Sequence, residues 1–430
     1  MSRFESWGRY PKVIQDEVAL NWGNEFPVKS LSKAMLPVGL GRSYGDVCLN
    51  DGNIVLLTRG LNRFLSFDPA TGVLRCEAGV SLAEILEFSV PRGWFLPVTP
   101  GTKYVTVGGA IANDVHGKNH HVAGTFGRFV RGFELVRSDG TRAFCSPESN
   151  PDGFAATIGG LGLTGLITWA EIQLRPVSGR SISIESVKFR GLNEFVVLSK
   201  ELSDHEYTVA WVDCVSSGKE FARGIFLAGD HSSQKSLSAR KSKRSLTFPC
   251  DLPSIALNRY SVAAFNAAYY RKQFHKHVST ASDYEPFFYP LDAILRWNRL
   301  YGKRGLTQFQ CCVPSAEAIS EILAVIAKSG LASFLAVLKV CGNLKSPGMM
   351  SFPMPGITLA LDFPMKAGRT EPLLERLNQM TADAGGRVYP AKDAFMTAKQ
   401  FRRFYPQWEE FARFVDPSFS SSFWRRVMNR

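Results

Sequence analysis

Residues 100–121 read PGTKYVTVGGAIANDVHGKNHH, and this stretch is the strongest sequence indication of the fold. It contains turn residues, hydroxyl groups, small residues and three histidines. A segment with a purely structural role would not require all of these together. Gly108 and Gly109, followed by small residues, would let a flat or extended ligand lie against the backbone. His116, Lys118 and Asn119 would supply hydrogen-bond donors to that ligand. The stretch therefore predicts a binding site.

Two further glycine-rich segments lie on either side of this stretch. Residues 38–46 read VGLGRSYGD, and residues 157–167 read TIGGLGLTGLI. Successive backbone N–H groups in such loops can line a concave site for a phosphate or pyrophosphate. The first loop is not a dinucleotide-binding fingerprint, because a long helix should open there, whereas the next residues read VCLNDG. Any one loop could be an ordinary turn, but three together predict a long, narrow ligand.

Length, charge and cysteine content narrow the possible functions but do not identify one. The length of 430 residues predicts two domains. The formal charge of +13 suits a nucleic acid, an anionic membrane surface or a phosphorylated substrate equally well. The eight cysteines lack CxxC spacing and a zinc-type histidine pattern, so neither a metal site nor structural disulfides are expected.

The sequence also bears on location. The first residues, MSRFESWGRYPKV, lack the apolar core of a signal peptide. No uncharged apolar run approaches the roughly 20 residues that a transmembrane helix needs. We therefore expect a protein that is cytoplasmic or peripherally bound at the inner membrane.

The pattern of secondary structure changes near Pro176. Before it, short strand-like runs such as 53–57, 132–136 and 166–174 dominate, and a capping box of Ser81 and Glu84 predicts one helix. After it, the elements are longer. Helical spacing predicts a helix over 315–328 and another that presents its apolar face up to residue 384, and strands are expected at 333–338 and 357–363. This alternation predicts an α+β sheet domain.

A basic segment divides this second region. Residues 229–253 read GDHSSQKSLSARKSKRSLTFPCDLP, which offers little apolar surface with which to fold. We expect a mobile loop there. Its lysines and arginines, followed by Leu246 and Phe248, would suit anionic lipid headgroups, and a merely solvated loop explains them equally well.

The motifs together resemble a known superfamily. GLGRSYGD, PGT, TVGGAIA, HGKNHH and GGLGLTG resemble the FAD-binding domain of the vanillyl-alcohol oxidase superfamily, also called the PCMH type. SFPMPG at 351–356 and AKD at 391–393 extend the resemblance across nearly the whole chain. It implies an α+β fold in which residues 1–177, completed by 387–430, bind FAD. Residues 178–386 would form a substrate-binding domain with an antiparallel sheet.

The resemblance also implies how FAD is held. Relatives often carry a histidine in the first loop that bonds covalently to the flavin, whereas here Arg42 precedes Ser43, so non-covalent FAD is implied. The residues implied to contact it are Gly39, Leu40, Gly41, Arg42, Ser43, Tyr44, Gly45, Pro100, Gly101, Thr102, Thr106, Gly108, Gly109, Ala112, Asn113, Val115, His116, Gly117, Asn119, Ile167 and Tyr389.

Alcohol oxidation needs a base for the hydroxyl proton and a hydride acceptor, and FAD would be the acceptor. Lys392 matches the catalytic lysine segment of the family and is the predicted base. Tyr44 and His116 are implied to face the reacting centre. The residues implied to bind substrate are Tyr301, Gln308, Gln310, Lys339 and Lys392.

Within the superfamily, the sequence motifs are most similar to those of oxidases that act on the 2′-hydroxyl of a polyprenyl-phosphoryl-β-D-ribose. The resemblance implies oxidation of that hydroxyl to a ketone, the first half of epimerisation to the arabinose form used in cell walls. A short-chain reductase would follow, and a quinone or oxygen would reoxidise the flavin. A D-arabinono-1,4-lactone or alditol oxidase is the alternative enzyme. A basic membrane- or nucleic-acid-binding module that retains the fold is the alternative of another class, although no nucleic-acid partner is expected.

Overall fold

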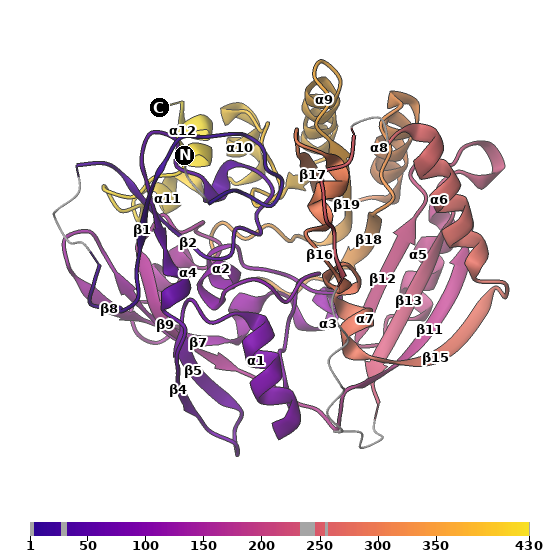
Figure 1. The fold of residues 1–430 in the computed structure, drawn as a ribbon. Helices are drawn as coiled ribbons and strands as arrows, with labels where there is room; N and C mark the ends of the chain where they lie inside the picture. Colours follow the sequence, from indigo (N-terminus) through magenta and orange to yellow (C-terminus); the bar gives the residue numbers. More distant parts are fainter. Residues whose placement is uncertain (1–3, 27–31, 233–245, 254–256, 430) are drawn as a thin grey trace.

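The structure is a computed structural model that describes residues 4–26, 32–232, 246–253 and 257–429. Figure 1 shows the N-terminal strands and the C-terminal helices together on one side, and a large sheet from the middle of the chain on the other. One hydrophobic core runs across both, because Leu36 and Val55 belong to the same buried cluster as Phe309 and Phe423.

Two sheets form the N-terminal side. A parallel sheet is ordered β1–β3–β2, and an antiparallel sheet is ordered β4–β5–β9–β7–β8. The strands are β1 (Asp16–Ala19), β2 (Met35–Val38), β3 (Ile54–Leu57), β4 (Phe64–Phe67), β5 (Val73–Glu77), β7 (Val130–Val136), β8 (Arg142–Cys145) and β9 (Leu166–Gln173). The strands expected at 53–57, 132–136 and 166–174 are confirmed to within two residues. The first glycine-rich loop follows β2, and the third leads into β9.

Short helices connect these strands. They are α1 (Leu82–Ser89), α2 (Val107–Ala112), α3 (His120–Ala123) and α4 (Pro151–Thr157). The predicted capping box is present at α1, where Ser81 Oγ accepts from the backbone N–H of Glu84 and the Glu84 carboxylate accepts from that of Ser81. A small ribbon of β6 (Trp94–Phe95) and β10 (Arg175–Pro176) leads toward the second sheet.

The middle of the chain forms an eight-stranded antiparallel sheet ordered β15–β11–β13–β12–β18–β19–β17–β20. The strands are β11 (Ser181–Phe189), β12 (Tyr207–Val212), β13 (Gly224–His231), β15 (His277–Asp283), β17 (Leu306–Val313), β18 (Ala336–Cys341), β19 (Gly356–Pro364) and β20 (Arg387–Val388). The expected antiparallel sheet is confirmed. The strand predicted at 333–338 begins later, at Ala336, because Ser333 Oγ accepts from the backbone N–H of Leu335 and holds that segment in a turn.

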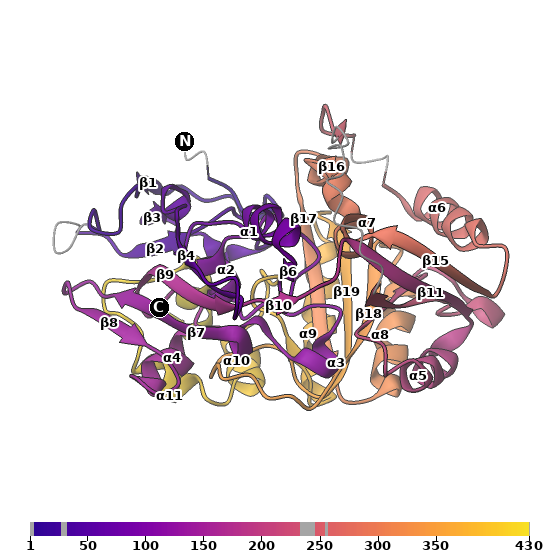
Figure 2. The ribbon, with the colours of Figure 1, turned by 90° about the horizontal axis from the view of Figure 1, so that it is seen from below.

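Helices cover both faces of this sheet. On one face lie α5 (Gly191–Glu201), α8 (Ala316–Ser329) and α9 (Thr370–Asp383), and on the other lies α6 (Arg259–Lys272), as Figure 2 shows. The helices predicted from Ser315 and around Leu377 are confirmed as α8 and α9. Because neighbouring residues of a strand point to opposite faces, Phe309 and Cys311 of β17 enter the core, whereas Gln308 and Gln310 face the N-terminal side.

The predicted basic loop is shorter than expected where it is described. Strand β13 continues to His231, and β14 (Leu246–Thr247) pairs with β16 (Ile294–Leu295), so two parts of the 229–253 segment are strands. Residues 233–245 lie outside the described residues. In the part of the chain that the structure describes, no helix has the length and apolarity that crossing a bilayer demands.

The C-terminal helices α10 (Ala398–Phe404), α11 (Trp408–Ala412) and α12 (Ser422–Met428) return to the N-terminal side, and the short α7 (Tyr284–Phe288) lies beside the large sheet. An ion-pair cluster fixes this return. Arg426 Nη2 lies 2.8 Å from Asp46 Oδ1 and 3.0 Å from Asp393 Oδ2. The first glycine-rich loop and the segment that carries Lys392 are therefore tied to the same guanidinium group.

Candidate active site

A cavity of about 580 Å³ lies between the two sides of the molecule. One wall consists of the three glycine-rich loops, and the other consists of β12, β17, β18 and β19 together with residues 288–297. This volume falls within the usual range of ligand sites, roughly 300 to 1,000 Å³. The strand alternation described above brings the polar residues of β17 to this wall.

Most of the predicted site residues line the cavity. They are Gly39, Leu40, Gly41, Arg42, Ser43, Tyr44, Pro100, Gly101, Thr102, Thr106, Gly108, Gly109, Ala112, Asn113, Val115, His116, Gly117, Ile167, Gln308, Gln310, Lys339, Tyr389 and Lys392. Residues from six separate segments of the sequence thus meet at one cavity.

Three predicted site residues do not line the cavity. Gly45 packs against the backbone of Asp393, where an added Cβ would lie 1.7 Å from the carbonyl oxygen. Asn119 donates from Nδ2 to the Pro97 carbonyl at 2.8 Å. Tyr301 is buried in a cluster with Tyr44, Trp297 and Leu306. These residues support the wall and do not form its surface.

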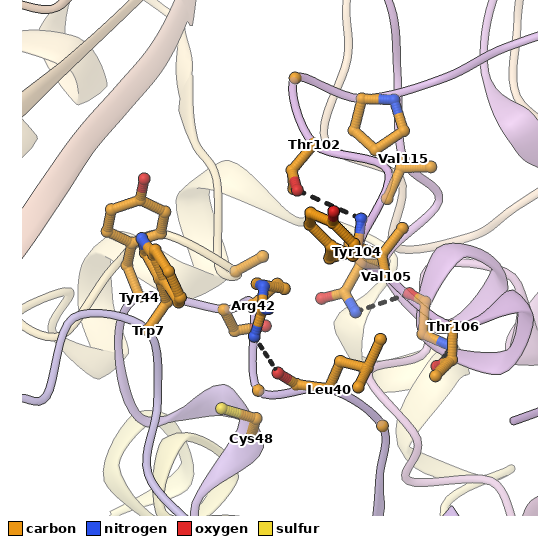
Figure 3. A pocket seen from close by; sticks show the side chains of 18 of the residues that line it. Trp7, Leu40, Arg42, Tyr44, Cys48, Thr102, Tyr104, Val105, Thr106 and Val115 are labelled. Atoms are coloured by element: carbon orange, nitrogen blue, oxygen red, sulfur yellow. Dashed lines mark hydrogen bonds between the residues drawn. The ribbon is translucent and has the colours of Figure 1, made fainter. Parts of the chain in front are cut away.

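The first glycine-rich loop offers donors to an anion. The backbone N–H groups of residues 40–43 have no acceptor among the described residues. Figure 3 shows Arg42 between Trp7 and Tyr44 on one side and Tyr104 on the other. Its Nη1 donates to the Leu40 carbonyl at 2.6 Å, and burial lowers the pKa of Arg42. A buried guanidinium beside free N–H groups fits an anionic group such as a pyrophosphate.

The second loop interlocks with the first. Thr106 caps α2, and its Oγ1 accepts from the Gly109 N–H at 3.1 Å. A Cβ on Gly39 would lie 2.2 Å from this same Oγ1, so only glycine fits there without displacing the cap. Asn113 donates to the Gly109 carbonyl at 2.8 Å, and its buried Oδ1 has no partner among the described residues. An unpaired buried acceptor on a glycine-lined wall points to a ligand.

Lys392, the predicted base, lines the cavity. Its Nζ is 4.1 Å from the centroid of the Tyr44 ring. Burial lowers the pKa of Lys392 to about 8, the negative charge of Asp362 opposes this shift, and the positive charge of Lys339 adds to it. Burial also raises the pKa of Asp362 to about 7, and Gln308 donates to its Oδ1 at 2.5 Å. The ammonium can therefore lose its proton near neutral pH.

His116 is held as a neutral donor. Burial, and after it the charge of Lys339, keeps the pKa of His116 well below its usual range. The amide nitrogen of Gln310 lies 2.9 Å from Nε2 and donates to it, which leaves the proton on Nδ1. That Nδ1 is buried and has no partner among the described residues. A ligand atom at the cavity would complete this hydrogen bond.

Two more lysines line the cavity, Lys339 on the sheet wall and Lys118 at the end of the second glycine-rich loop beside it. Lys118 donates to the Phe287 carbonyl, and burial lowers its pKa to about 7. Lys339 donates to the Gly117 carbonyl at 3.2 Å, and burial lowers its pKa. Neither has a carboxylate partner among the described residues. Because isolated buried charge is costly, this part of the cavity favours an anionic ligand.

Some residues of the site were not predicted from the sequence. Asp362 carried a usable signal, since it is the only charged residue in the apolar run 357–363. Trp7, over which Arg42 lies at 4.6 Å, belongs to an N-terminal segment without any motif. Asp292 also lines the cavity and accepts from the Lys103 N–H at 2.9 Å. Only the tertiary fold brings Trp7 and Asp292 to the cavity.

Comparison with known proteins agrees with this geometry. The family pattern described as FAD binding domain matches residues 28–146, which hold the first two glycine-rich loops. The chain is 35% identical to decaprenylphosphoryl-β-D-ribose oxidase of Mycolicibacterium smegmatis, over 99% of this chain and 97% of that protein.

Two other similarities cover less of the chain. Δ(24)-sterol reductase of Rattus norvegicus is 30% identical over 33% of this chain and 28% of its own. A putative D-arabinono-1,4-lactone oxidase of Neurospora crassa is 30% identical over 34% of this chain and 25% of its own. The predicted family and cofactor are thus confirmed, and the unpaired donors and glycines of the cavity wall fit FAD. The chain belongs to the FAD-dependent oxidoreductases of the vanillyl-alcohol oxidase, or PCMH-type, superfamily, and within it to the family of decaprenylphosphoryl-β-D-ribose oxidase.

Proposed function

We propose that this oxidoreductase converts the 2′-hydroxyl of a polyprenyl-phosphoryl-β-D-ribose to a ketone, with FAD held non-covalently. The observation that carries the proposal is the charge of the sheet wall. Lys392 can act as a base near neutral pH, and two further lysines, Lys339 on this wall and Lys118 beside it, have no carboxylate partners among the described residues. The similarity over 99% of the chain to an oxidase of this lipid-linked ribose supports the same substrate class.

Lys392, Tyr44 and His116 would each have a separate role in the oxidation. FAD, when bound, accepts the hydride from the sugar carbon. Lys392 in its neutral form takes the hydroxyl proton, and the Tyr44 ring 4.1 Å away receives the resulting ammonium as a cation–π partner. His116, fixed by Gln310, would donate from Nδ1 to a sugar or cofactor oxygen. These groups fix the position of the hydroxyl before the proton leaves.

The substrate phosphate would be held by lysine. Among the described residues, Lys118 and Lys339 each donate one hydrogen bond, to a backbone carbonyl, although each ammonium has three N–H donors. The Lys118 ammonium also lies over the Phe287 ring, 4.9 Å from its centroid. A phosphate oxygen would satisfy the remaining donors and neutralise the buried charge. The wall therefore favours a sugar that carries a phosphate over an uncharged lactone or alditol.

The proposal includes partners that follow from this chemistry. The keto product must be reduced at the same carbon to give the arabinose form, so a short-chain reductase would act next. The reduced flavin must lose its electrons, and a quinone or oxygen would accept them. Since a polyprenyl chain stays in a bilayer, the protein would work in peripheral contact with the inner membrane.

The test is anaerobic bleaching of the flavin absorbance by four compounds. Polyprenyl-phosphoryl ribose in detergent should bleach it, whereas free ribose, arabinonolactone and xylitol should not. The Lys339→Met variant should keep its yellow cofactor and require a lipid concentration about tenfold higher or more for half-maximal reduction, because it loses a charged partner of the phosphate. Bleaching by the lactone or the alditol alone would replace the proposal with the alternative enzyme.

A further inference from the structure

The outer side of α6 carries exposed aromatic residues. The buried residues Val262 and Tyr270 fix the helix on the sheet, and Tyr270 packs against Trp211. On the opposite side, Tyr260 is 84% exposed, and Phe274, just beyond the helix, is 90% exposed. Phe265 and Tyr269 lie on the flank of the helix, where they are partly exposed and stack on each other with ring centroids 6.2 Å apart. Their inner edges contact Phe334 and Trp211. We call Tyr260, Phe265, Tyr269 and Phe274 the α6 face.

The chain segment that carries the α6 face has charge of one sign, although Glu194 of α5 pairs with Lys276 just beyond it. Residues 252–282 contain no aspartate or glutamate. Arg259 at the start of the helix and Arg271 and Lys272 at its end are exposed. Between them the helix carries no charge at all, which is unusual for a water-facing helix. Aromatic residues flanked by cations are typical of a helix that rests at the surface of an anionic bilayer.

The α6 face is on the same side of the molecule as the rim of the cavity. Ile294 lines the cavity and is 38% exposed, and it pairs across β14–β16 with Leu246, which is 72% exposed. Figure 2 shows β16 and α6 on one side of the molecule. Leu257, just before α6, packs in the cluster that contains Tyr44. An apolar path therefore runs from the α6 face toward the reacting centre.

We propose that the α6 face, with Leu246 and Ile294, docks on an anionic lipid bilayer and holds the cavity rim against it. This inference rests on the proposed function, because a polyprenyl-linked substrate must be reached in its membrane. Charge distinguishes the bilayer from a second copy of the chain. Two α6 faces packed on each other would oppose cations to cations, whereas anionic headgroups complement them.

The test is co-sedimentation of the FAD-loaded protein with vesicles. Vesicles with about 30 mol% phosphatidylglycerol should bind it, and pure phosphatidylcholine should bind it more weakly. The double variant Tyr260→Ser/Phe274→Ser should bind about tenfold less or weaker still, because it loses two inserting rings without touching the core. The control Ile14→Ser/Val197→Ser removes residues that are 80% and 50% exposed elsewhere, and it should bind like the unaltered protein.

Turnover separates this inference from the proposed function. Flavin reduction by substrate in detergent should be the same in the Tyr260→Ser/Phe274→Ser variant and the unaltered protein, while reduction by substrate embedded in vesicles should slow in the variant alone. Absence of vesicle binding, or equal binding by both proteins, would overturn the docking surface and leave the detergent result standing. A dimer in sedimentation velocity that the double variant abolishes would also overturn it, in favour of self-association.

Discussion

The pH dependence of flavin reduction tests the assignment of Lys392 as the base. Burial lowers its pKa from 10.5 to about 8, which multiplies the neutral fraction at pH 7 by about 300. Neutral lysine is the active form, so the rate should be low where the ammonium persists and should rise to a plateau above about pH 8. Lys392→Met should keep bound FAD and lose roughly 10²-fold or more of the rate, together with this rise.

Two neighbours should move the midpoint of the rise in opposite directions. The charge of Asp362 raises the pKa of Lys392, so Asp362→Asn should shift the midpoint to lower pH. The charge of Lys339 lowers it, so Lys339→Met should shift the midpoint to higher pH. A neighbouring charge in a buried cluster is worth roughly 1 to 3 pH units. Asparagine at 362 also keeps an acceptor for the Gln308 amide, which limits the change to charge.

The assay is anaerobic stopped-flow reduction of the bound flavin with saturating lipid substrate across pH. Lys399→Met is the matched control, since Lys399 is exposed on α10, and its profile should match that of the unaltered protein. If Lys392→Met keeps the rise near pH 8, another group is the base. If Asp362→Asn and Lys339→Met move the midpoint in the same direction, the electrostatic reasoning is wrong.

Three further predictions concern the cofactor wall and its support. Acid precipitation should release all FAD into the supernatant, because Arg42 stands where relatives carry the bonding histidine; a yellow pellet would contradict this. Gly39→Ala should displace the Thr106 cap and weaken FAD binding by about tenfold, measured by fluorescence titration. Arg426→Gln should leave Asp46 without its ion-pair partner and cost about 3 kcal/mol of unfolding free energy, visible as a lower Tm.

The local features were predictable from the sequence because local physics sets them. The capping box at Ser81 and Glu84 needs only residues three apart, and it is present. The α8 helix begins after Ser315 and ends before Gly330, as its cap residues indicate. The glycine-rich loops indicated a binding site because a backbone that closely approaches a ligand leaves no room for side chains, which favours glycine.

The arrangement across the cavity was less predictable because it depends on tertiary packing. Gln308 and Gln310 alternate with the apolar Phe309 and Cys311. The two-residue period of a strand therefore places both glutamines on one face. Tyr301 matched the family pattern equally well, yet it packs behind the cavity-lining Tyr44 and Trp297, and nothing local distinguishes it. The coupling of Lys392 with Asp362 joins segments 30 residues apart in sequence, and only the sheet register brings them together.

The two walls of the cavity divide cofactor binding from substrate choice. The loop wall presents mainly backbone, glycines and one guanidinium, so it can hold FAD whatever the substrate. The sheet wall presents Gln308, Gln310 and Lys339, with Lys118 of the second loop beside them, and this set of polar and charged groups suits one class of substrate. Relatives with different named activities are similar over only about a third of this chain, whereas the ribose oxidase is similar over all of it. Exchanging Lys339 for a neutral residue should therefore change which substrate reduces the flavin and leave the affinity for FAD unchanged.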